Sequence, residues 1–164
     1  MNYLKISIGI FLALASSRFI PHPPNFTSLI TLSFYVPAIL GVKFIPIIIL
    51  SFLVTDIFLG FHNTLLFTWG SAALIGYISI LLNHSMLKRL TGVTIGALLF
   101  FIVTNFGVWI LGETYSKNID GILVCYTLAL PFFLNSLVST IVFSSVIEGL
   151  LKINFVKNFK KSFK

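Results

Sequence analysis

The sequence predicts an all-α integral membrane protein, a bundle of six transmembrane helices with both termini in the cytoplasm. The first observation is composition: 57% of the 164 residues are hydrophobic, only 9% are charged, and the mean hydropathy is +1.05. Soluble domains carry about a quarter charged residues, so four acidic residues in the whole chain are too few for a water-exposed surface. The second observation is a series of six apolar segments, and the third is the distribution of basic residues around them.

The six apolar segments are separated by short polar or Gly/Pro-containing breaks, and a membrane-spanning helix needs roughly 20 predominantly apolar residues. The break between the second and third segments is the weakest, because it rests on Gly41-Val42-Lys43 alone. The last segment is long for one span, about 45 Å at 1.5 Å per residue, so we expect Pro131 to kink it or its end to emerge into the interface. The predicted spans are residues 3–20, 27–41, 44–60, 64–83, 92–112 and 122–151.

The basic residues indicate the orientation. With six spans and both termini on one side, nine of the eleven basic residues fall on that side, which the positive-inside rule makes cytoplasmic. They are Lys5, Lys43, Lys88, Arg89 and the five lysines from Lys152 to Lys164. The predicted location is the inner (plasma) membrane of a bacterium, with a transmembrane domain over residues 1–151 and a basic cytoplasmic tail over residues 152–164.

The tail follows directly after the last span and interleaves Lys and Phe, as in Phe159-Lys160-Lys161-Ser162-Phe163-Lys164. Each cation near an anionic membrane surface contributes about 1 kcal/mol. We therefore expect the tail to bind anionic lipid and no nucleic acid.

The first segment has a second interpretation, as a cleaved signal peptide. Lys5 precedes an apolar run, and Ala13-Leu14-Ala15 is similar to a small-residue cleavage site. Arg18, directly after that site, is more typical of the end of a retained helix. We expect a retained span, although charge alone leaves the five-span alternative open.

The sequence argues against an enzyme and against a bound cofactor. Cys125 is the one cysteine, which allows no internal disulfide and no multi-thiolate metal site. The chain contains no nucleophile elbow, no His-Glu-x-x-His and no phosphate-binding loop. His22, His62, Asp56 and Glu113 are metal ligands by type, but no two are spaced as a local helical ligand pair, so no metal site is predicted.

Charged groups inside a bilayer cost at least a few kcal/mol each, so their positions point to function. Arg18 lies about two residues inside the outer end of the first span and Asp56 about four residues inside the outer end of the third. At this shared depth the two side chains can form an ion pair. The alternative is that Arg18 extends to the interface while Asp56 joins a local hydrogen-bond network.

Further polar groups gather at the same outer side. The loop over residues 21–26 is stiffened by three prolines and is expected to form a lid that carries His22 and Asn25, while His62 lies at another outer helix end. Asn105 and Trp109 share one face of the fifth span, and Glu113 continues that stripe to the rim. Tyr126 lies about one and a half turns into the sixth span.

Together these side chains predict an outward-facing pocket for a small polar solute, with aromatic walls. Its expected ligand-binding residues are Arg18, His22, Asn25, Asp56, His62, Asn105, Trp109, Glu113 and Tyr126. The alternative is a set of separate interhelical hydrogen bonds in a scaffold protein.

The first span also carries small residues at a spacing of four, Gly9, Ala13 and Ser17. Such a ridge allows the backbone of another helix to approach closely. It predicts a docking face for a second membrane subunit, or else packing within the protein's own bundle.

In organisation the chain resembles the S components of energy-coupling factor transporters. Local stretches are similar to motifs of uncharacterised bacterial membrane proteins grouped with them, which have no assigned substrate: Ser17-Arg18-Phe19-Ile20-Pro21-His22-Pro23-Pro24-Asn25-Phe26, Asp56-Ile57-Phe58-Leu59-Gly60-Phe61-His62, Asn105-Phe106-Gly107-Val108-Trp109, and Cys125-Tyr126 through Pro131-Phe132-Phe133. The resemblance implies capture of a vitamin-like molecule in an outward pocket capped by loops. It also implies partners, a transmembrane coupling subunit and two ATPases.

The chain departs from that family at two places. The usual Ala-x-x-x-Ala of the first helix is replaced by Gly9, Ala13 and Ser17, and the chain begins Met1-Asn2 where nickel and cobalt members begin Met-His. The second departure argues against those metals. We therefore predict a solute-binding subunit for uptake of a vitamin-like polar molecule, energised by partners, with a non-transporting scaffold of cell-envelope assembly as the alternative.

Overall fold

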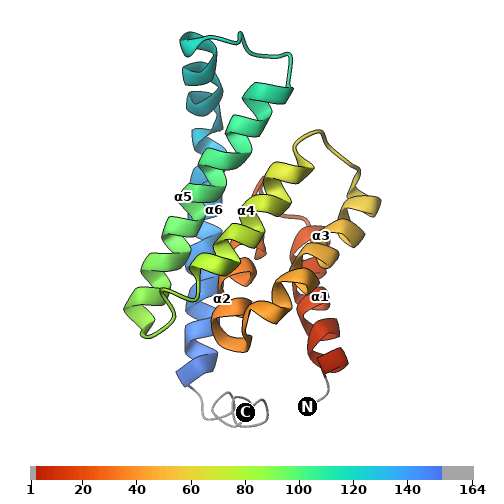
Figure 1. Cartoon of the computed structure of the whole chain (residues 1–164), viewed down its shortest axis with the longest axis vertical. Helices are drawn as coiled ribbons and strands as arrows, with labels where there is room; N and C mark the ends of the chain where they lie inside the picture. The colour runs from red at the N-terminus through yellow and green to blue at the C-terminus, as the bar shows by residue number, and fades with distance from the viewer. Residues whose placement is uncertain (1–2, 153–164) are drawn as a thin grey trace.

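The computed structural model describes residues 3–152, and within this range the chain is all-helical, with no β-strand. The predicted number and order of the helices is confirmed. They are α1 (Tyr3–Phe19), α2 (Leu29–Leu40), a short 3-10 helix η1 (Val42–Phe44), α3 (Ile45–Leu59), α4 (Leu65–Ile78), α5 (Met86–Leu111) and α6 (Ile119–Lys152), shown in Figure 1. The tail predicted to bind lipid lies outside the described residues, apart from Lys152.

The helix boundaries follow local chemistry. Gly41 ends α2 with a φ of +98°, a conformation that side-chain-bearing residues rarely adopt, so the break expected at Gly41-Val42-Lys43 is real. α5 begins six residues before the predicted span, because the Ser85 hydroxyl caps it by accepting from the Lys88 N–H at 3.2 Å. α6 is one helix of 34 residues that continues through Pro131.

Three stretches are long and apolar enough to cross a membrane, Val42–Leu59, Met86–Leu111 and Ile119–Lys152. The helices α2 and α4 are apolar but shorter. Large apolar side chains also cover the outward faces of the bundle, among them Leu66, Leu81 and Leu123. A water-soluble protein rarely exposes such a surface, whereas a bilayer matches it.

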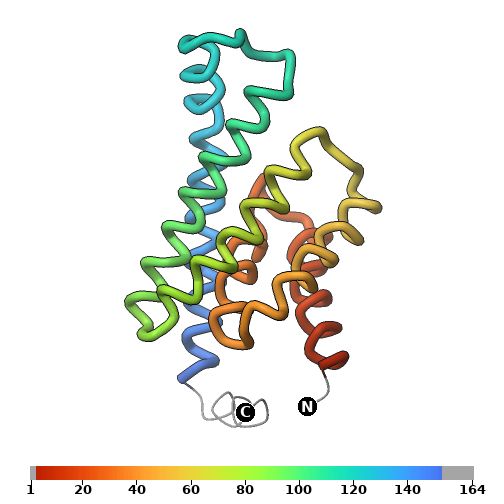
Figure 2. Tube along the Cα trace, in the orientation of Figure 1, coloured from red at the N-terminus to blue at the C-terminus, as the bar shows by residue number. Residues whose placement is uncertain are grey.

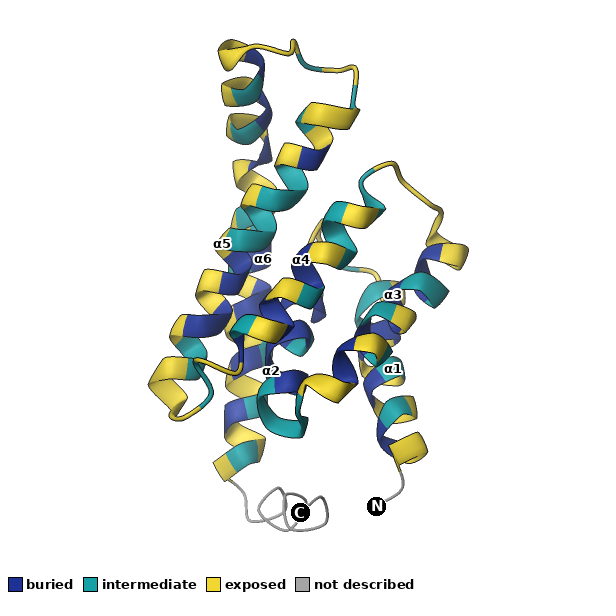
Figure 3. Ribbon diagram, in the orientation of Figure 1, coloured by how far each residue is buried: buried dark blue, intermediate teal, exposed yellow. Residues whose placement is uncertain are grey.

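α2 lies at the centre of the bundle and contacts each of the other helices. Eight of its twelve residues are buried, as expected for a helix that is hydrophobic all round. Phe34 and Tyr35 of α2 join Leu14, Phe44 and Phe52 in the core. Figure 3 shows the buried residues along the inner sides of the helices and the exposed ones on the outside.

Figures 1 and 2 show that the start of α1 and the end of α6 lie at the same end of the bundle, called here the terminal end. At the opposite end the hairpin of α5 and α6 extends past the other helices, because these two helices are the longest. The α5–α6 connection is therefore far from the terminal end, while the loop joining α4 to α5 is close to it.

Glycine allows close packing where α5 meets the core. A Cβ at Gly92 would lie 2.6 Å from ring atoms of the fully buried Phe34 and 2.9 Å from Leu82 Cβ. We expect Gly92→Ala to lower the free energy of unfolding by about 1–3 kcal/mol through overpacking, measured as a lower Tm in detergent. Gly149→Ala in α6 is the control, since a Cβ there meets nothing within 4 Å, and an equal loss in both variants would contradict the packing explanation.

Candidate functional site

Arg18 and Asp56 form an ion pair at the end of the bundle opposite the terminal end. Arg18 Nη2 lies 2.6 Å from Asp56 Oδ1, and Arg18 Nη1 donates to the Thr55 hydroxyl. Trp69 Nε1 donates to the other carboxylate oxygen of Asp56 at 2.9 Å. The predicted ion pair is confirmed, and the network joins α1, α3 and α4.

The burial of this pair differs between its two members. Asp56 is 1% exposed, while the Arg18 side chain is 15% exposed. Both oxygens of the carboxylate are occupied by donors, whereas the two bonds of Arg18 use two of the five N–H groups of a guanidinium. Asp56 therefore holds Arg18 in place and Arg18 is the member that reaches the neighbouring cavity.

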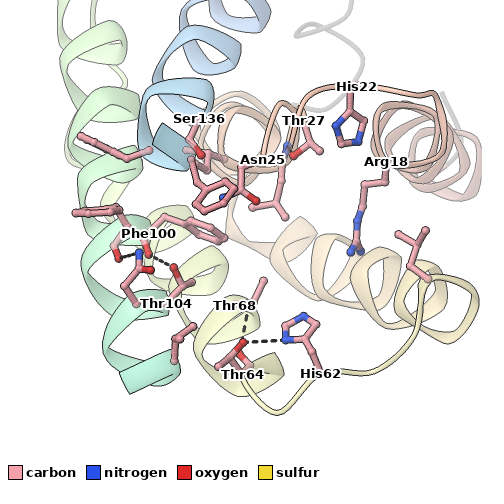
Figure 4. A pocket seen from close by; sticks show the side chains of 18 residues that line it. Arg18, His22, Asn25, Thr27, His62, Thr64, Thr68, Phe100, Thr104 and Ser136 are labelled. Carbon is pink, nitrogen blue, oxygen red and sulfur yellow. Dashed lines mark hydrogen bonds between the residues drawn. The ribbon is translucent and has the colours of Figure 1, made fainter. Parts of the chain in front are cut away.

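The cavity beside Arg18 has a volume of about 550 Å³. Its walls come from the end of α1, the α1–α2 loop, the α3–α4 connection, and the facing sides of α2, α4, α5 and α6, as Figure 4 shows in part. The polar lining residues are Arg18, His22, Asn25, Thr27, His62, Thr64, Thr68, Thr104, Asn105 and Ser136. Segments far apart in the sequence thus converge on one space large enough for a small organic molecule.

The α1–α2 loop lies at the edge of this cavity, as the lid prediction expected, and is anchored at several points. The Ser17 and Ser28 hydroxyls lie 2.7 Å apart and connect the two helix ends that the loop joins. Asn135 of α6 donates to the Pro24 carbonyl at 3.0 Å. Asn25 has a φ of +63° and lines the cavity together with His22.

The structure brings together five of the nine predicted ligand-binding residues. Arg18, His22, Asn25, His62 and Asn105 line the cavity. His62 Nδ1 is 2.8 Å from the Thr64 hydroxyl, and Asn105 Nδ2 donates to the Phe101 carbonyl within α5 at 2.8 Å. The internal partner expected for Asn105 is therefore the backbone of its own helix. This bond uses one amide N–H of Asn105 and does not involve its amide oxygen.

The other four predicted residues lie outside the lining. Asp56 acts through Arg18, as described above. Trp109 donates to the Ser116 carbonyl at 2.9 Å, and Tyr126 donates to the Ile102 carbonyl at 2.6 Å. Glu113 is an exposed residue in the α5–α6 connection.

The physical reason for this correction differs among the residues. Glu113 lies in the α5–α6 connection, which extends past the shorter helices (Figure 1). Tyr126 lies beside the cavity-lining Phe101, 5.5 Å between ring centroids, but its hydroxyl is bonded to the Ile102 carbonyl. Trp109 instead belongs to the hairpin turn, where Lys117 Nζ lies 5.7 Å from the centre of its ring and donates to its carbonyl. Asn105 and Trp109 share a helix face, but Val108 lines the cavity whereas the Trp109 indole is bonded to the Ser116 carbonyl in the α5–α6 connection.

The aromatic walls of the cavity are phenylalanines, Phe100 and Phe101 on α5 and Phe132 and Phe133 on α6. The rings of Phe101 and Phe133 lie 4.6 Å apart between centroids. The lining contains no carboxylate, and no three His, Cys, Asp or Glu side chains within residues 3–152 are placed to hold a metal ion. The cavity therefore offers hydrogen-bond donors and aromatic surface.

A second buried ion pair, absent from the sequence prediction, lies toward the terminal end. Arg89 of α5 binds Glu148 of α6 through two bonds of 2.7 Å, Nε to Oε1 and Nη2 to Oε2, and Tyr35 of α2 donates to Oε1 at 2.9 Å. The Glu148 side chain is 3% exposed. Arg89 was predicted only as one of the basic residues of the cytoplasmic side. The carboxylate of Glu148 inside the apolar run Val146-Ile147-Glu148-Gly149-Leu150 is the signal in the sequence that points to this site.

The small-residue ridge of α1 divides into two parts. Gly9 and Ala13 are exposed, and a Cβ at Gly9 would meet nothing within 4 Å. Ser17 is half-buried and bonds to Ser28 of the same bundle. Packing within the bundle therefore explains Ser17 but leaves Gly9 and Ala13 on the outer surface.

Comparison with known proteins places the chain in one family. No curated protein and no solved structure matches it at a significant level. A family model described as a family of unknown function (DUF6580) matches residues 2–161, nearly the whole chain. This chain belongs to DUF6580, a family of unknown function.

Proposed function

We propose that this protein is a membrane-embedded solute-binding subunit for uptake of a vitamin-like small polar molecule, energised by partner subunits. The observation that carries the proposal is the cavity of about 550 Å³ in which Arg18, two loops and three helices supply polar groups beside four phenylalanines. Small-molecule sites are typically concave, largely apolar and provided with a few convergent polar groups. The resemblance to S components of energy-coupling factor transporters supports the same function.

The lining indicates the chemistry of the solute. Because Asp56 offsets the charge of Arg18, the site supplies N–H donors without a large excess of positive charge. The Asn and Thr side chains add neutral hydrogen-bonding groups, and the phenylalanine rings favour a flat apolar body. We therefore propose an aromatic or heterocyclic solute that carries a carbonyl or carboxylate acceptor for Arg18.

The proposed topology has six spans with the cavity facing outward and both termini in the cytoplasm. The common position of the start of α1 and the end of α6 supports it, as does the positive-inside rule. α2 and α4 rise about 18 and 21 Å at 1.5 Å per residue, less than a hydrocarbon core of about 30 Å. α2 is enclosed by other helices, and local thinning of the bilayer accommodates α4.

The proposed docking face for a coupling subunit is the exposed part of the α1 ridge. Gly9 and Ala13 present small side chains on the outer surface, where another helix can approach closely. A transmembrane coupling subunit and ATPases would supply the energy, because the chain itself contains no nucleotide-binding motif.

The test is a thermal-shift screen of the purified full-length protein against vitamins, nucleobase derivatives, aromatic carboxylates and amino-acid-like solutes. A ligand at about 100 times its Kd adds about 2.7 kcal/mol of stability, which raises Tm by roughly 5–10 °C for a chain of this length. We expect Arg18→Ala to weaken binding at least about 10-fold, the effect of losing a hydrogen bond from a charged donor.

Two further variants separate binding from folding. Asn105→Ala removes a cavity side chain whose bond is local to α5, so we expect an unchanged Tm without solute and about 3- to 10-fold weaker binding. Lys88→Ala, at an exposed position, is expected to bind like wild type. No stabilising solute in the panel, with a cell-envelope protein co-purifying instead, would overturn the proposal in favour of a scaffold.

A further inference from the structure

The inner face of α6 carries a row of polar residues that begins at the cavity. Ser136 lines the cavity, and Thr140, Ser144 and Glu148 follow at intervals of four residues, so all four lie on one side of the helix. Each is at most 5% exposed. Glu148 lies twelve positions after Ser136, about 18 Å along the helix axis, so the row ends at the Arg89–Glu148 pair.

Two hydroxyls of this row, Thr140 Oγ1 and Ser144 Oγ, make no hydrogen bond of normal geometry in the part of the chain that the structure describes, and the Ser144 hydroxyl lies beside that of Tyr35. Other hydroxyls of the same helix return a bond to their own backbone: Ser139 donates to the Ser136 carbonyl and Ser145 to the Ile141 carbonyl. Such bonds are the usual state of a hydroxyl in a membrane helix. Within α6, the unpaired hydroxyls are therefore those of the inner row.

α2 contributes two further unpaired hydroxyls, Thr31 Oγ1 and Ser33 Oγ, of which Thr31 is on the side of the helix that carries Tyr35. Asn135 of α6 bonds Pro24, and Glu148 bonds Tyr35, so the two segments run in the same direction with a nearly constant offset along the chain. Thr31 precedes Tyr35 by one turn, as Ser144 precedes Glu148. Its hydroxyl is fully buried and has no hydrogen-bond partner among the described residues.

A buried hydroxyl without a partner is costly, and three of them along one seam mark a place where water completes the hydrogen bonds. Apolar seams exclude water, but here the seam begins at a polar cavity and ends at a carboxylate. Water molecules can therefore enter from the cavity and bridge successive hydroxyls.

Glu148 does not continue this row as a proton carrier. The two bonds from Arg89 and the bond from Tyr35 favour the ionised carboxylate and occupy both its oxygens. The same bonds tie α2, α5 and α6 together at one point. The Arg89–Glu148–Tyr35 network therefore closes the space between these three helices at the end of the row.

We propose that the seam between α2 and α6 is a hydrated polar path that leads from the cavity toward the terminal end and is closed there by the Arg89–Glu148 pair. This path gives the bundle an exit on the side opposite its cavity, with the ion pair as the gate. That a solute leaves through it rests on the proposed function; the hydration of the seam does not.

The path is tested by cysteine modification of full-length protein in membrane vesicles, starting from Cys125→Ser. Ser136→Cys, Thr140→Cys and Ser144→Cys are each treated with 2-aminoethyl methanethiosulfonate, which reacts with the thiolate. Because a thiol in apolar surroundings stays protonated, we expect all three to react at least about 10-fold faster than Ala97→Cys, the matched position in the apolar core. Thr140→Cys and Ser144→Cys reacting as slowly as Ala97→Cys would overturn the path.

The gate is tested in the Ser144→Cys protein with Glu148→Gln, which weakens the ion pair, and with Tyr35→Phe, which removes one bond and no charge. We expect faster modification in both, with the larger increase for Glu148→Gln. Unchanged rates in both folded variants would overturn the gate. Solute stabilisation with an inert seam would leave the proposed function standing and refute the path, whereas reactive seam cysteines support the path whether or not a solute is found.

Discussion

Replacing Glu148 with alanine is expected to lower the free energy of unfolding by about 3–5 kcal/mol, the usual cost of leaving one member of a buried ion pair without its partner. Arg89 would keep its charge next to α2 and α6 with no carboxylate to bind, and Tyr35 would lose its acceptor. The measurement is the Tm of the detergent-purified variant, or the midpoint of its unfolding by denaturant.

Two comparisons identify the cause of this loss. Glu113→Ala removes an exposed carboxylate and is expected to change stability by less than about 0.5 kcal/mol. Arg89→Met combined with Glu148→Leu removes both charges, so the double variant should be more stable than Glu148→Ala, as found when buried pairs are replaced by apolar residues. If the stability loss of the double variant equals the sum of the losses of its two single variants, the two side chains act independently.

Replacing Asp56 with alanine is expected to cost a similar amount, about 3–5 kcal/mol, and in addition to weaken solute binding. Arg18 would lose the carboxylate that holds its guanidinium, and Trp69 its acceptor. A free guanidinium can turn away from the cavity, so under the proposed function the thermal shift given by a solute should fall together with Tm.

Trp69→Phe separates the two effects of Asp56. It removes one hydrogen bond to a charged acceptor, worth about 1.5–3 kcal/mol, while the ion pair with Arg18 stays. We expect a lower Tm but a retained solute shift. Asp120→Asn, in the exposed first turn of α6, should cost less than about 1 kcal/mol. Wild-type stability in Asp56→Ala would contradict the structural role assigned to the pair.

The parts of the site that could be predicted are those that depend only on how far a residue lies from the end of its apolar segment. Arg18 and Asp56 lie at similar distances from the ends of apolar runs, and an ion pair at that depth is the simplest way to lower the cost of both charges. The loop with His22 and Asn25 must lie at the same end because it joins the end of α1, which carries Arg18, to α2. Trp69 gave no such signal, since a tryptophan within a span is also a common packing residue.

The pair of Arg89 and Glu148 shows the limit of this reasoning. Arg89 lies beside Lys88 near a predicted membrane boundary, where a cation is ordinary, and its partner is 59 residues away. The Tyr35 hydroxyl that completes the network is 113 residues from Glu148. No local spacing links these three residues, so only the packing of α2 against α5 and α6 brings them together.

The sequence by itself determined the helices, their order and the depth of each polar group, because apolar runs and their breaks are local properties of the chain. The tertiary structure alone decided which of these groups meet. Rotation of each helix and the unequal helix lengths place Asn105 in the cavity, direct Trp109 and Tyr126 to backbone carbonyls outside its lining, and leave Glu113 in the connection beyond it. They also bring Tyr35 of α2 to Glu148 of α6, since the facing sides of two helices depend on the contacts of the whole bundle.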